Sequence, residues 1–384
     1  MNKSLYIVAF SLAFATTGIA QNNEGQDKVI DLGTQTTTEL RKTQAVSTIY
    51  SDELDKNATT SPYNAIYGLL PGLSVMQNTS WGTDKSRLNV RGRGSLNGDT
   101  PLFVVDGFAR PLEYINLSEI ESISVLKDGA ATALWGGRGA NGVVLITTKR
   151  GIYSQKDIKV DYKFGLGFPV NQPEFADAYT YAKARNEALR YDGLQPDMDE
   201  ASFLSGGNSD LYPNVDWQKE ALRNHTTSHQ LDITFRGGGK RLRYFSVLNY
   251  KNDMGLLNSK YTDYTDRYNS QMKKYFLNLR MNLDVDITDA TKLKLSMLGM
   301  LRETKRPTTS EATLFEQIFN TPSAAFPVQT LNGFWGSNNV LKTNPIANLA
   351  DVGYYKLNQR MLQADLRLVQ DLSVLTRGLS AELA

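Results

Sequence analysis

The chain has 384 residues, a formal net charge of +2 and no cysteine. Its 42 basic and 40 acidic residues nearly balance, so the chain creates no overall field for nucleic acid or acidic lipid. The absence of cysteine excludes both a disulfide framework and a lipidated N-terminal cysteine.

The first twenty residues, MNKSLYIVAFSLAFATTGIA, have the layout of a cleaved secretory signal. Lys3 precedes an apolar core from Leu5 to Ala15, and small residues stand before Gln21. This core is too short to span a bilayer, and no later stretch approaches the roughly 18 apolar residues of a transmembrane helix. We therefore expect an exported chain, which could enter a membrane only as β-strands.

Residues 21–50 are polar and rich in Thr, Gln and Asn, which predicts an extended tether with one apolar island at Val29–Gly33. Residues 51–151 predict a compact α/β globule. SPYNAIYGLLPG is typical of a helix that begins at a Ser N-cap and ends at Pro-Gly. Turn signals such as Asp106-Gly107 then separate the strand candidates LSVMQ, SRLNVRG, PLFVVDG, ISVLKD and GVVLITT.

The stretch GGRGANGVVLITTKRG contains a literal G-x-G-x-x-G at Gly137, Gly139 and Gly142. A nucleotide fingerprint needs a strand before the glycines and a helix after them. Here the helical candidate KDGAATALW comes first and the β-branched strand candidate VVLITT follows, so we reject a nucleotide site. The glycines instead predict a tight, backbone-packed turn. Arg138 and Asn141 project from this turn and either pair with carboxylates of a surrounding wall or are solvated.

Beyond Gly151, segments of about ten residues alternate apolar and polar side chains. YFLNLRMNLDVDIT is the clearest, and DIKVDYKFGLGF, TKLKLSMLGML and MLQADLRLVQ repeat the pattern. A soluble sandwich also alternates. Short turns such as DITDATK, however, alternate with long polar excursions at residues 169–228 and 303–359. This asymmetry favours a transmembrane barrel over a sandwich.

Residues 274–302 are predicted to form a membrane-crossing hairpin with Leu279, Met281 and Leu283 facing lipid. On this hypothesis Met281→Arg is costly, whereas Asn282→Arg on the opposite face is tolerated.

The remaining polar constellations predict no catalytic, metal or nucleic-acid site. His225 and His229 lead into a strand without a third ligand nearby, which argues against a metal site. The basic residues from Arg87 to Arg93 lack interleaved aromatic residues, which argues against nucleic acid. Asp106 at a strand end has no nucleophile or base spaced with it, so a turn role is expected. We expect no cofactor.

Two long motifs carry a family resemblance. NVRGRGSLNGDTPLFVVDG followed by ISVLKDGAATALWGGRGANGVVLITTKRG resembles the plug domain of SusC/RagA-type TonB-linked outer-membrane transporters. VIDLGTQTTTELRKTQAVSTI resembles the segment that leads into this plug, and NVDWQKEALR, TPSAAFPV and NPIANL resemble early barrel loops. The resemblance implies a plug inside a large barrel and energised import of oligosaccharides or peptides. It also implies a SusD-like surface lipoprotein and periplasmic TonB as partners.

The resemblance also suggests functional residues. The island on the tether is expected to bind TonB as an extended peptide that adds a strand to a partner's sheet; it comprises Val29, Ile30, Asp31, Leu32 and Gly33. The plug motif residues, expected to shape the plug or contact the barrel, are Arg91, Gly92, Asp106, Gly107, Lys127, Asp128, Arg138, Gly139, Asn141 and Gly142.

The expected fold class is an α+β plug domain followed by antiparallel transmembrane β-barrel strands in the outer membrane. The expected boundaries are a signal at 1–20, a periplasmic tether at 21–50, the plug at 51–151 and barrel strands at 152–384. A transporter barrel of about 22 strands needs several hundred residues, so we expect the barrel in this chain to be incomplete. Two alternatives are a transport-incompetent periplasmic or outer-membrane fragment and an exported glycan-active α/β enzyme. The enzyme would need paired carboxylates, which the sequence does not indicate.

Overall fold

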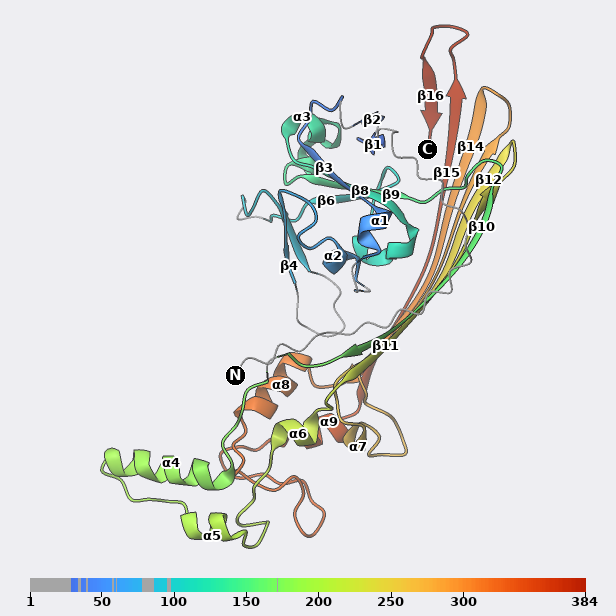
Figure 1. Cartoon of the computed structure of the whole chain (residues 1–384). Helices are drawn as coiled ribbons and strands as arrows, with labels where there is room; N and C mark the ends of the chain where they lie inside the picture. The colour runs from blue at the N-terminus through green and yellow to red at the C-terminus, as the bar shows by residue number, and fades with distance from the viewer. Residues whose placement is uncertain are drawn as a thin grey trace.

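The computed structural model describes residues 29–33, 36–38, 41–56, 59, 61–77, 86–94, 98–170 and 172–384. The predicted signal at 1–20 lies outside the described residues. The described chain has three parts, in which an N-terminal domain lies against the concave side of a long curved sheet, and helices gather at one end of that sheet (Figure 1).

The N-terminal domain is built on a five-stranded sheet of order β3-β8-β9-β6-β7. Its strands are β3 Val46–Tyr50, β8 Ile120–Leu126, β9 Val143–Thr148, β6 Leu102–Val105 and β7 Phe108–Ala109. Only β6 and β9 pair in parallel within this sheet. Because β3 belongs to the sheet, the domain begins before the boundary that we predict at residue 51.

Short elements surround this sheet. The predicted helix after Ser61 is a single turn, since it ends at Ala65. The other elements of the domain are the hairpin β4 Leu73–Met76 with β5 Arg87–Val90, the pair β1 Val29–Asp31 with β2 Thr36–Thr38, α1 Ser51–Leu54, α2 Pro62–Ala65, α3 Gly129–Thr132, and the 3-10 turns η1 Leu112–Tyr114, η2 Leu117–Glu119 and η3 Ala133–Gly139. The predicted order of helix, glycine turn and strand is observed in α3, η3 and β9.

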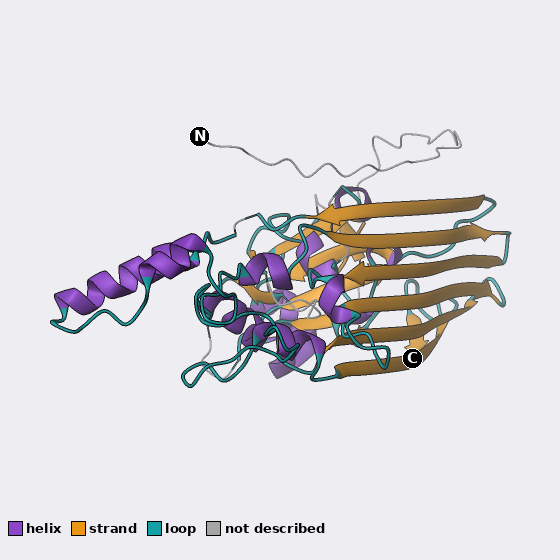
Figure 2. Ribbon diagram, turned by 90° about the horizontal axis from the view of Figure 1, so that it is seen from below, coloured by secondary structure: helices purple, strands orange, loops and turns teal. Residues whose placement is uncertain are grey.

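The second sheet, called the wall below, has seven strands that pair antiparallel in chain order from β10 to β16 (Figure 2). Its strands are β10 Lys156–Gly167, β11 Thr226–Gly238, β12 Leu242–Met254, β13 Lys273–Asp286, β14 Thr291–Pro307, β15 Tyr354–Asp371 and β16 Ser380–Leu383. Over the described residues the sheet stays open, with β10 and β16 at its edges. The prediction of antiparallel strands that form an incomplete barrel is therefore confirmed.

The connections between wall strands are short at one end of the sheet and long at the other end. Residues 239–241 and 287–290 make tight turns, whereas 168–225, 255–272 and 308–353 form what we call the helical cap. The cap carries α4 Ala178–Tyr191, α5 Glu200–Ser205, α6 Trp217–Ala221, α7 Ser259–Thr262, α8 Glu311–Asn320 and α9 Pro345–Ala350. Its segments share one apolar core that includes Trp217, Tyr261, Leu314, Ile318, Phe326 and Ile346. None of the helices in the described ranges has the length and apolar character needed to cross a membrane.

Candidate functional site

The wall exposes apolar side chains on one face and buries polar side chains on the other, which is the reverse of a sheet in a soluble protein. On β13, Leu277, Leu279 and Met281 are 38–48% exposed, whereas the intervening polar side chains are almost fully buried. The buried polar residues of this strand are Lys274, Asn278, Arg280, Asn282 and Asp284. A soluble sheet hides its apolar face and exposes its polar face. The outer surface therefore suits lipid, as predicted for Leu279 and Met281.

The N-terminal domain covers the polar face, and a buried ion pair lies at the centre of the contact. Glu119 ends η2 and pairs with the Arg280 guanidinium of β13, and both side chains are buried. The Asn278 amide also donates to Glu119. Burial raises the pKa of Glu119, and the Arg280 charge opposes that change. Buried charges persist when they are paired and hydrogen-bonded, as they are here.

Asp232 of β11 holds the same turn from a second side. Its carboxylate accepts hydrogen bonds from the Asn116 amide at 2.9 Å and from the Ser118 hydroxyl at 3.3 Å. The wall residues Gln230 and Asn249 also donate to it. Side chains of two wall strands, β11 and β13, therefore hold the segment Asn116–Glu119 in place.

The end of the N-terminal domain makes a third contact. Arg150 donates to Asp284 at 2.6 Å and to the Ser296 hydroxyl at 3.1 Å. The Asn282 amide donates to the Thr148 hydroxyl at 2.9 Å and to the Lys149 carbonyl at 2.7 Å. The expectation that Asn282→Arg is tolerated is therefore wrong, because Asn282 lies buried under the N-terminal domain and not in open solvent.

Strand β15 adds further contacts between the N-terminal domain and the wall. Arg110 pairs with Asp365, and Arg367 donates to the Asp106 carbonyl at 2.7 Å. A Cβ at Gly107 would lie 2.7 Å from the same Arg367 guanidinium. Among the predicted motif residues, Asp106 and Gly107 are thus the pair that meets the wall. Asp106 also accepts from the Thr148 backbone N–H at 3.0 Å and thereby joins β6 to β9.

Arg138 and Asn141 do not contact the wall in the part of the chain that the structure describes. The Asn141 amide donates to the Gly98 carbonyl within its own domain at 3.1 Å. Both residues follow α3, which lies on the side of the domain away from the wall (Figure 1). Of the two readings that the sequence leaves open for these residues, pairing with wall carboxylates is not observed in the described ranges. Arg110 and Arg150 make such pairs instead.

Other predicted motif residues stabilise the domain itself. Asp128 caps α3 and accepts from the backbone N–H groups of Ala45 and Ala131, each at 2.8 Å. These bonds hold the pKa of Asp128 below its ordinary value. Lys127 donates to the Ser47 hydroxyl at 2.6 Å, and burial lowers its pKa. Arg91 and Gly92 form a left-handed turn after β5, with φ of 56° and 85°.

The glycine turn is as tightly packed as the sequence indicates. Gly142 has a φ of +89°, and a Cβ there would lie 2.8 Å from Val90. A Cβ at Gly139 would lie 3.1 Å from the Thr132 carbonyl oxygen and from the Trp135 Cβ. The glycines therefore shape a corner of the domain and cradle no phosphate, because strand β9 follows them.

The predicted TonB-binding segment does not extend freely. β1 pairs with β2, and Ile30, only 1% exposed, packs with Leu32 into an apolar cluster of the N-terminal domain. Leu145 and Trp135 belong to the same cluster. The segment is thus folded onto the domain, whereas the sequence predicts a tether.

The most important contact residues were missed from sequence. Asn116 and Glu119 form a capping box at η2. The spacing Asn-x-x-Glu is a readable signal for such a box, although it does not reveal that Glu119 faces an arginine of the wall.

The histidines make local contacts, since His229 shares a hydrogen bond of 2.7 Å with the Tyr162 hydroxyl. Within the described ranges no group of His, Asp or Glu side chains is arranged to hold a metal ion.

Comparison with known proteins agrees with this geometry. Residues 38–143 match the family model described as TonB-dependent Receptor Plug Domain. The chain is 30% identical over 283 residues to TonB-dependent receptor SusC of Bacteroides thetaiotaomicron, which covers 69% of this chain and 26% of the relative. It is 28% identical over 281 residues to TonB-dependent receptor P26 of Formosa agariphila, which covers 71% of this chain and 26% of the relative.

A solved structure shows the same fold. The RagAB peptide importer in the open-open state aligns with a TM-score of 0.67 and 21% identity over 89% of this chain and 40% of that chain. The plug match and the inverted wall define the chain as a TonB-dependent receptor with its plug and early barrel strands. Within that class, its sequence is similar to that of the SusC-type receptors. It spans about a quarter of the length of the curated relatives.

Proposed function

We propose that this chain provides the plug and early barrel strands of an outer-membrane transporter that imports oligosaccharides or peptides. TonB would energise import, and a SusD-like surface lipoprotein would assist at the helical cap. The chain would reach the outer membrane through the signal predicted at 1–20. The RagAB relative is described as a peptide importer, which supports one of the two substrate classes.

The polar contact between plug and wall carries the proposal. Glu119, Arg110 and Arg150 bind the wall through ion pairs. Water can replace hydrogen bonds and ion pairs of this kind at a modest net free-energy cost. A plug held in this way can therefore rearrange inside a barrel without exposing an apolar core, which a transport cycle requires.

The proposed TonB contact is the segment Val29–Gly33. Its strand pairing with β2 supports the proposal, because strand addition needs the same extended backbone. Because Ile30 and Leu32 are buried, TonB would have to compete with their packing. Fully burying an aliphatic side chain of this size contributes roughly 1.5–3 kcal/mol.

Uptake of labelled oligosaccharides and peptides by cells with and without TonB tests the proposal. We expect uptake only with TonB. Ile30→Pro should abolish crosslinking of the full-length receptor to TonB, because proline removes a backbone donor and bends the strand. Ile30→Val keeps the donor and is the matched control. Uptake that is independent of TonB would contradict the proposed function, and unchanged crosslinking of Ile30→Pro would exclude this segment alone.

A further inference from the structure

The outer face of the wall, which carries Leu277 and Leu279, ends towards the helical cap in what we call the lysine row. Lys273 of β13 lies directly opposite Lys305 of β14, and Lys305 lies directly opposite Lys356 of β15. Side chains along a strand alternate between the two faces, so Lys273 projects from the same face as Leu277 and Leu279. Three cations therefore stand side by side on three neighbouring strands.

The lysine row lies just beyond the apolar belt of the outer face. Every outward residue of β13 from 277 to 285 is apolar, and this length is close to the roughly 9–11 residues with which a tilted strand crosses a bilayer. Lys273 precedes that stretch on the side of the helical cap (Figure 1). Because outer-membrane barrels have short periplasmic turns and longer extracellular loops, the lysine row of the proposed transporter lies at the headgroups of the external leaflet.

The lysine row carries more positive charge than its neighbours offset. Like charges directly opposite one another on adjacent strands destabilise a sheet unless an anion neutralises them. Two carboxylates, those of Glu303 and Asp263, act on Lys305, and Glu303 already binds Lys356 at 2.9 Å. Within the described ranges, neither Lys273 nor Lys305 forms an ion pair with a carboxylate. The row therefore has room for a further anion.

The turn end of the same strands has no such row. Val285 of β13 lies opposite Leu293 of β14, and Leu293 lies opposite Leu368 of β15. Apolar side chains thus occupy the outward positions there. A general need to keep strand ends hydrated would place charge at both ends, so the lysine row points to a feature of one leaflet.

A groove of about 260 Å³ lies on the outer face beside the lysine row. Two tyrosines and two leucines give it apolar surface and an arginine adds a cation; these are Tyr250, Tyr275, Leu277, Leu301 and Arg360. Glu303, the partner of Lys356, also lines the groove and joins it to the lysine row. Arg360 lies opposite Leu301 within the apolar belt, and its long side chain can carry the guanidinium towards the headgroups.

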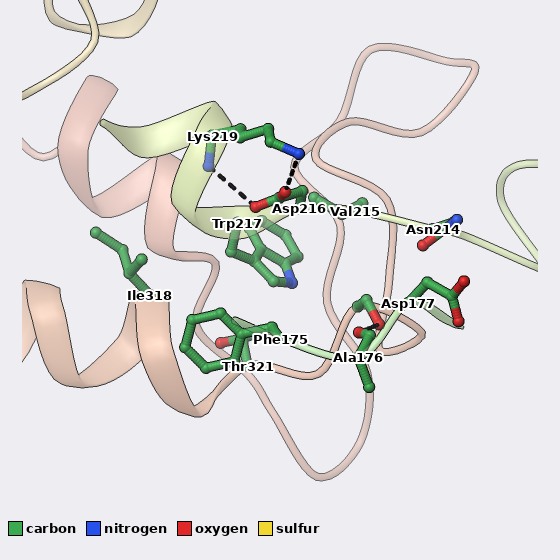
Figure 3. Close-up of a pocket in the computed structure, with 11 residues that line it drawn as sticks. Phe175, Ala176, Asp177, Asn214, Val215, Asp216, Trp217, Lys219, Ile318 and Thr321 are labelled. Atoms are coloured by element: carbon green, nitrogen blue, oxygen red, sulfur yellow. Dashed lines mark hydrogen bonds and ion pairs between the residues drawn. The ribbon is translucent and has the colours of Figure 1, made fainter. Parts of the chain in front are cut away.

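The cavity of the helical cap has the opposite charge balance. Its volume is about 340 Å³, and Figure 3 shows the residues that line it. Lys219 binds Asp216 at 2.9 Å and is thereby neutralised, whereas Asp177 lines the same cavity as a second carboxylate. An anion would be repelled there, so the cap cavity does not compete with the lysine row for it.

We infer that the lysine row and Arg360 bind the phosphate group of a lipid in the external leaflet, with the apolar part of that lipid in the adjacent groove. Phosphate oxygens accept hydrogen bonds from ammonium and guanidinium groups, and basic clusters at a membrane surface bind anionic headgroups. A free anion would use the cations without the groove, and an uncharged lipid would use the groove without the cations. The inference goes beyond the proposed function, because it concerns the surrounding membrane and not the imported substrate.

Native mass spectrometry of the full-length receptor in detergent measures this binding without TonB or an energy source. The probes are lipid A with its phosphate groups and the same lipid after a phosphatase has removed them. We expect the phosphorylated probe to bind with a Kd at least about tenfold lower, since several cations contact its phosphate. Inorganic phosphate at the same concentration should leave the bound lipid in place, because it cannot fill the groove.

Variants locate the site on the wall. Lys305→Gln and Arg360→Gln each remove one cation and should each raise the Kd about fivefold, as expected for one basic residue near a membrane surface. Lys305→Arg keeps the charge and should retain binding, which separates loss of charge from misfolding. Lys156→Gln is the matched control, because Lys156 lies at the turn end of β10, opposite Gly237. It should leave the Kd unchanged.

Each contrary outcome identifies a different occupant. Equal Kd values for the two lipid probes, or wild-type affinity in both Lys305→Gln and Arg360→Gln, would overturn the inference. Displacement of the lipid by inorganic phosphate would assign the row to a free anion, and a receptor dimer that dissociates in Lys305→Gln would assign it to a second copy of the chain. Either result would also overturn the inference. Failure of TonB-dependent uptake in a receptor that binds the phosphorylated lipid as expected would contradict the proposed function alone.

Discussion

At the scale of single residues, the plug depends on positions where a backbone group has little room. Gly142 combines a φ of +89° with a Cβ approach of 2.8 Å to Val90. Gly142→Ala should therefore destabilise the plug by about 1–3 kcal/mol, the usual cost of such strain. Hydrogen exchange of the β9 amides measures the loss.

Gly137 provides the control within the same sequence motif. It has no positive φ, and a Cβ there would meet nothing within 4 Å. Gly137→Ala should leave exchange nearly unchanged. If hydrogen exchange of the β9 amides accelerated equally in Gly142→Ala and Gly137→Ala, the positive φ and close packing of Gly142 would not explain the loss of stability.

Asp128 links plug stability to pH. Its pKa is lowered in the folded plug by backbone N–H groups of Ala45 and Ala131. A lowered pKa in the folded state means that the stabilisation is complete above the unfolded value, about 4, and disappears as pH falls through the folded value. Asp128→Ala should cost about 1–2 kcal/mol at pH 7. The difference in β3 and β8 exchange between variant and wild type should shrink below about pH 4, and a pH-independent difference would argue against an ionised cap.

At the scale of elements, the destabilisation caused by a charged residue on the outer face of β13 should depend on how deep that residue lies in the bilayer. Met281 lies within the strand and is 48% exposed on the outer face. Met281→Arg should cost about 2–4 kcal/mol in the membrane if it lies near the midplane. Ile287, similarly exposed beside the short turn, should tolerate Arg at about 0–1 kcal/mol. Urea unfolding in lipid vesicles compares the two, and equal losses would favour a soluble sheet.

The elements also show how far sequence reasoning reaches. Alternation predicted the wall strands because side-chain direction in a strand has a period of two. The β-branched residues of β9 and the small residues of α3 predicted that a helix precedes the glycine turn and a strand follows it. The pair β1 and β2 was not predicted, because short polar strands such as TTT have no distinctive pattern. The contact between Glu119 and Arg280 joins residues 161 positions apart, a pairing that no local pattern can specify.

At the scale of the whole molecule, the ion pair between Glu119 and Arg280 is more deeply buried than the pairs that Arg110 and Arg150 make with the wall. Arg280→Met should destabilise the plug against the wall by about 3–5 kcal/mol, because Glu119 would remain buried without its cation. The double variant Glu119→Met with Arg280→Met should recover much of that loss, since two apolar side chains leave no buried charge. Hydrogen exchange of η2 and β8 reports the coupling. A double variant that is as unstable as the sum of both single variants would show that the two side chains act independently.

A substitution in the helical cap tests whether the cap is a structural unit separate from the plug. Its segments come from connections far apart in the chain but share the core around Trp217, which is buried and packs edge-on against Phe326 with ring centroids 5.3 Å apart. Truncating a buried aromatic side chain typically costs about 3–5 kcal/mol. Because the plug does not contribute to this core, Trp217→Ala should loosen 168–225 and 308–353 together and leave the plug protected.

Limited proteolysis of the receptor in vesicles measures this division directly. In Trp217→Ala, cleavage should accelerate in both connections, since each loses the packing of the other. Phe203→Ala is the control, because Phe203 of α5 packs edge-on with Tyr212, with ring centroids 5.4 Å apart, and lies outside the shared core. It should expose only the region around α5. If Trp217→Ala accelerated cleavage in 168–225 alone, the two connections would be independent loops and would not stabilise each other.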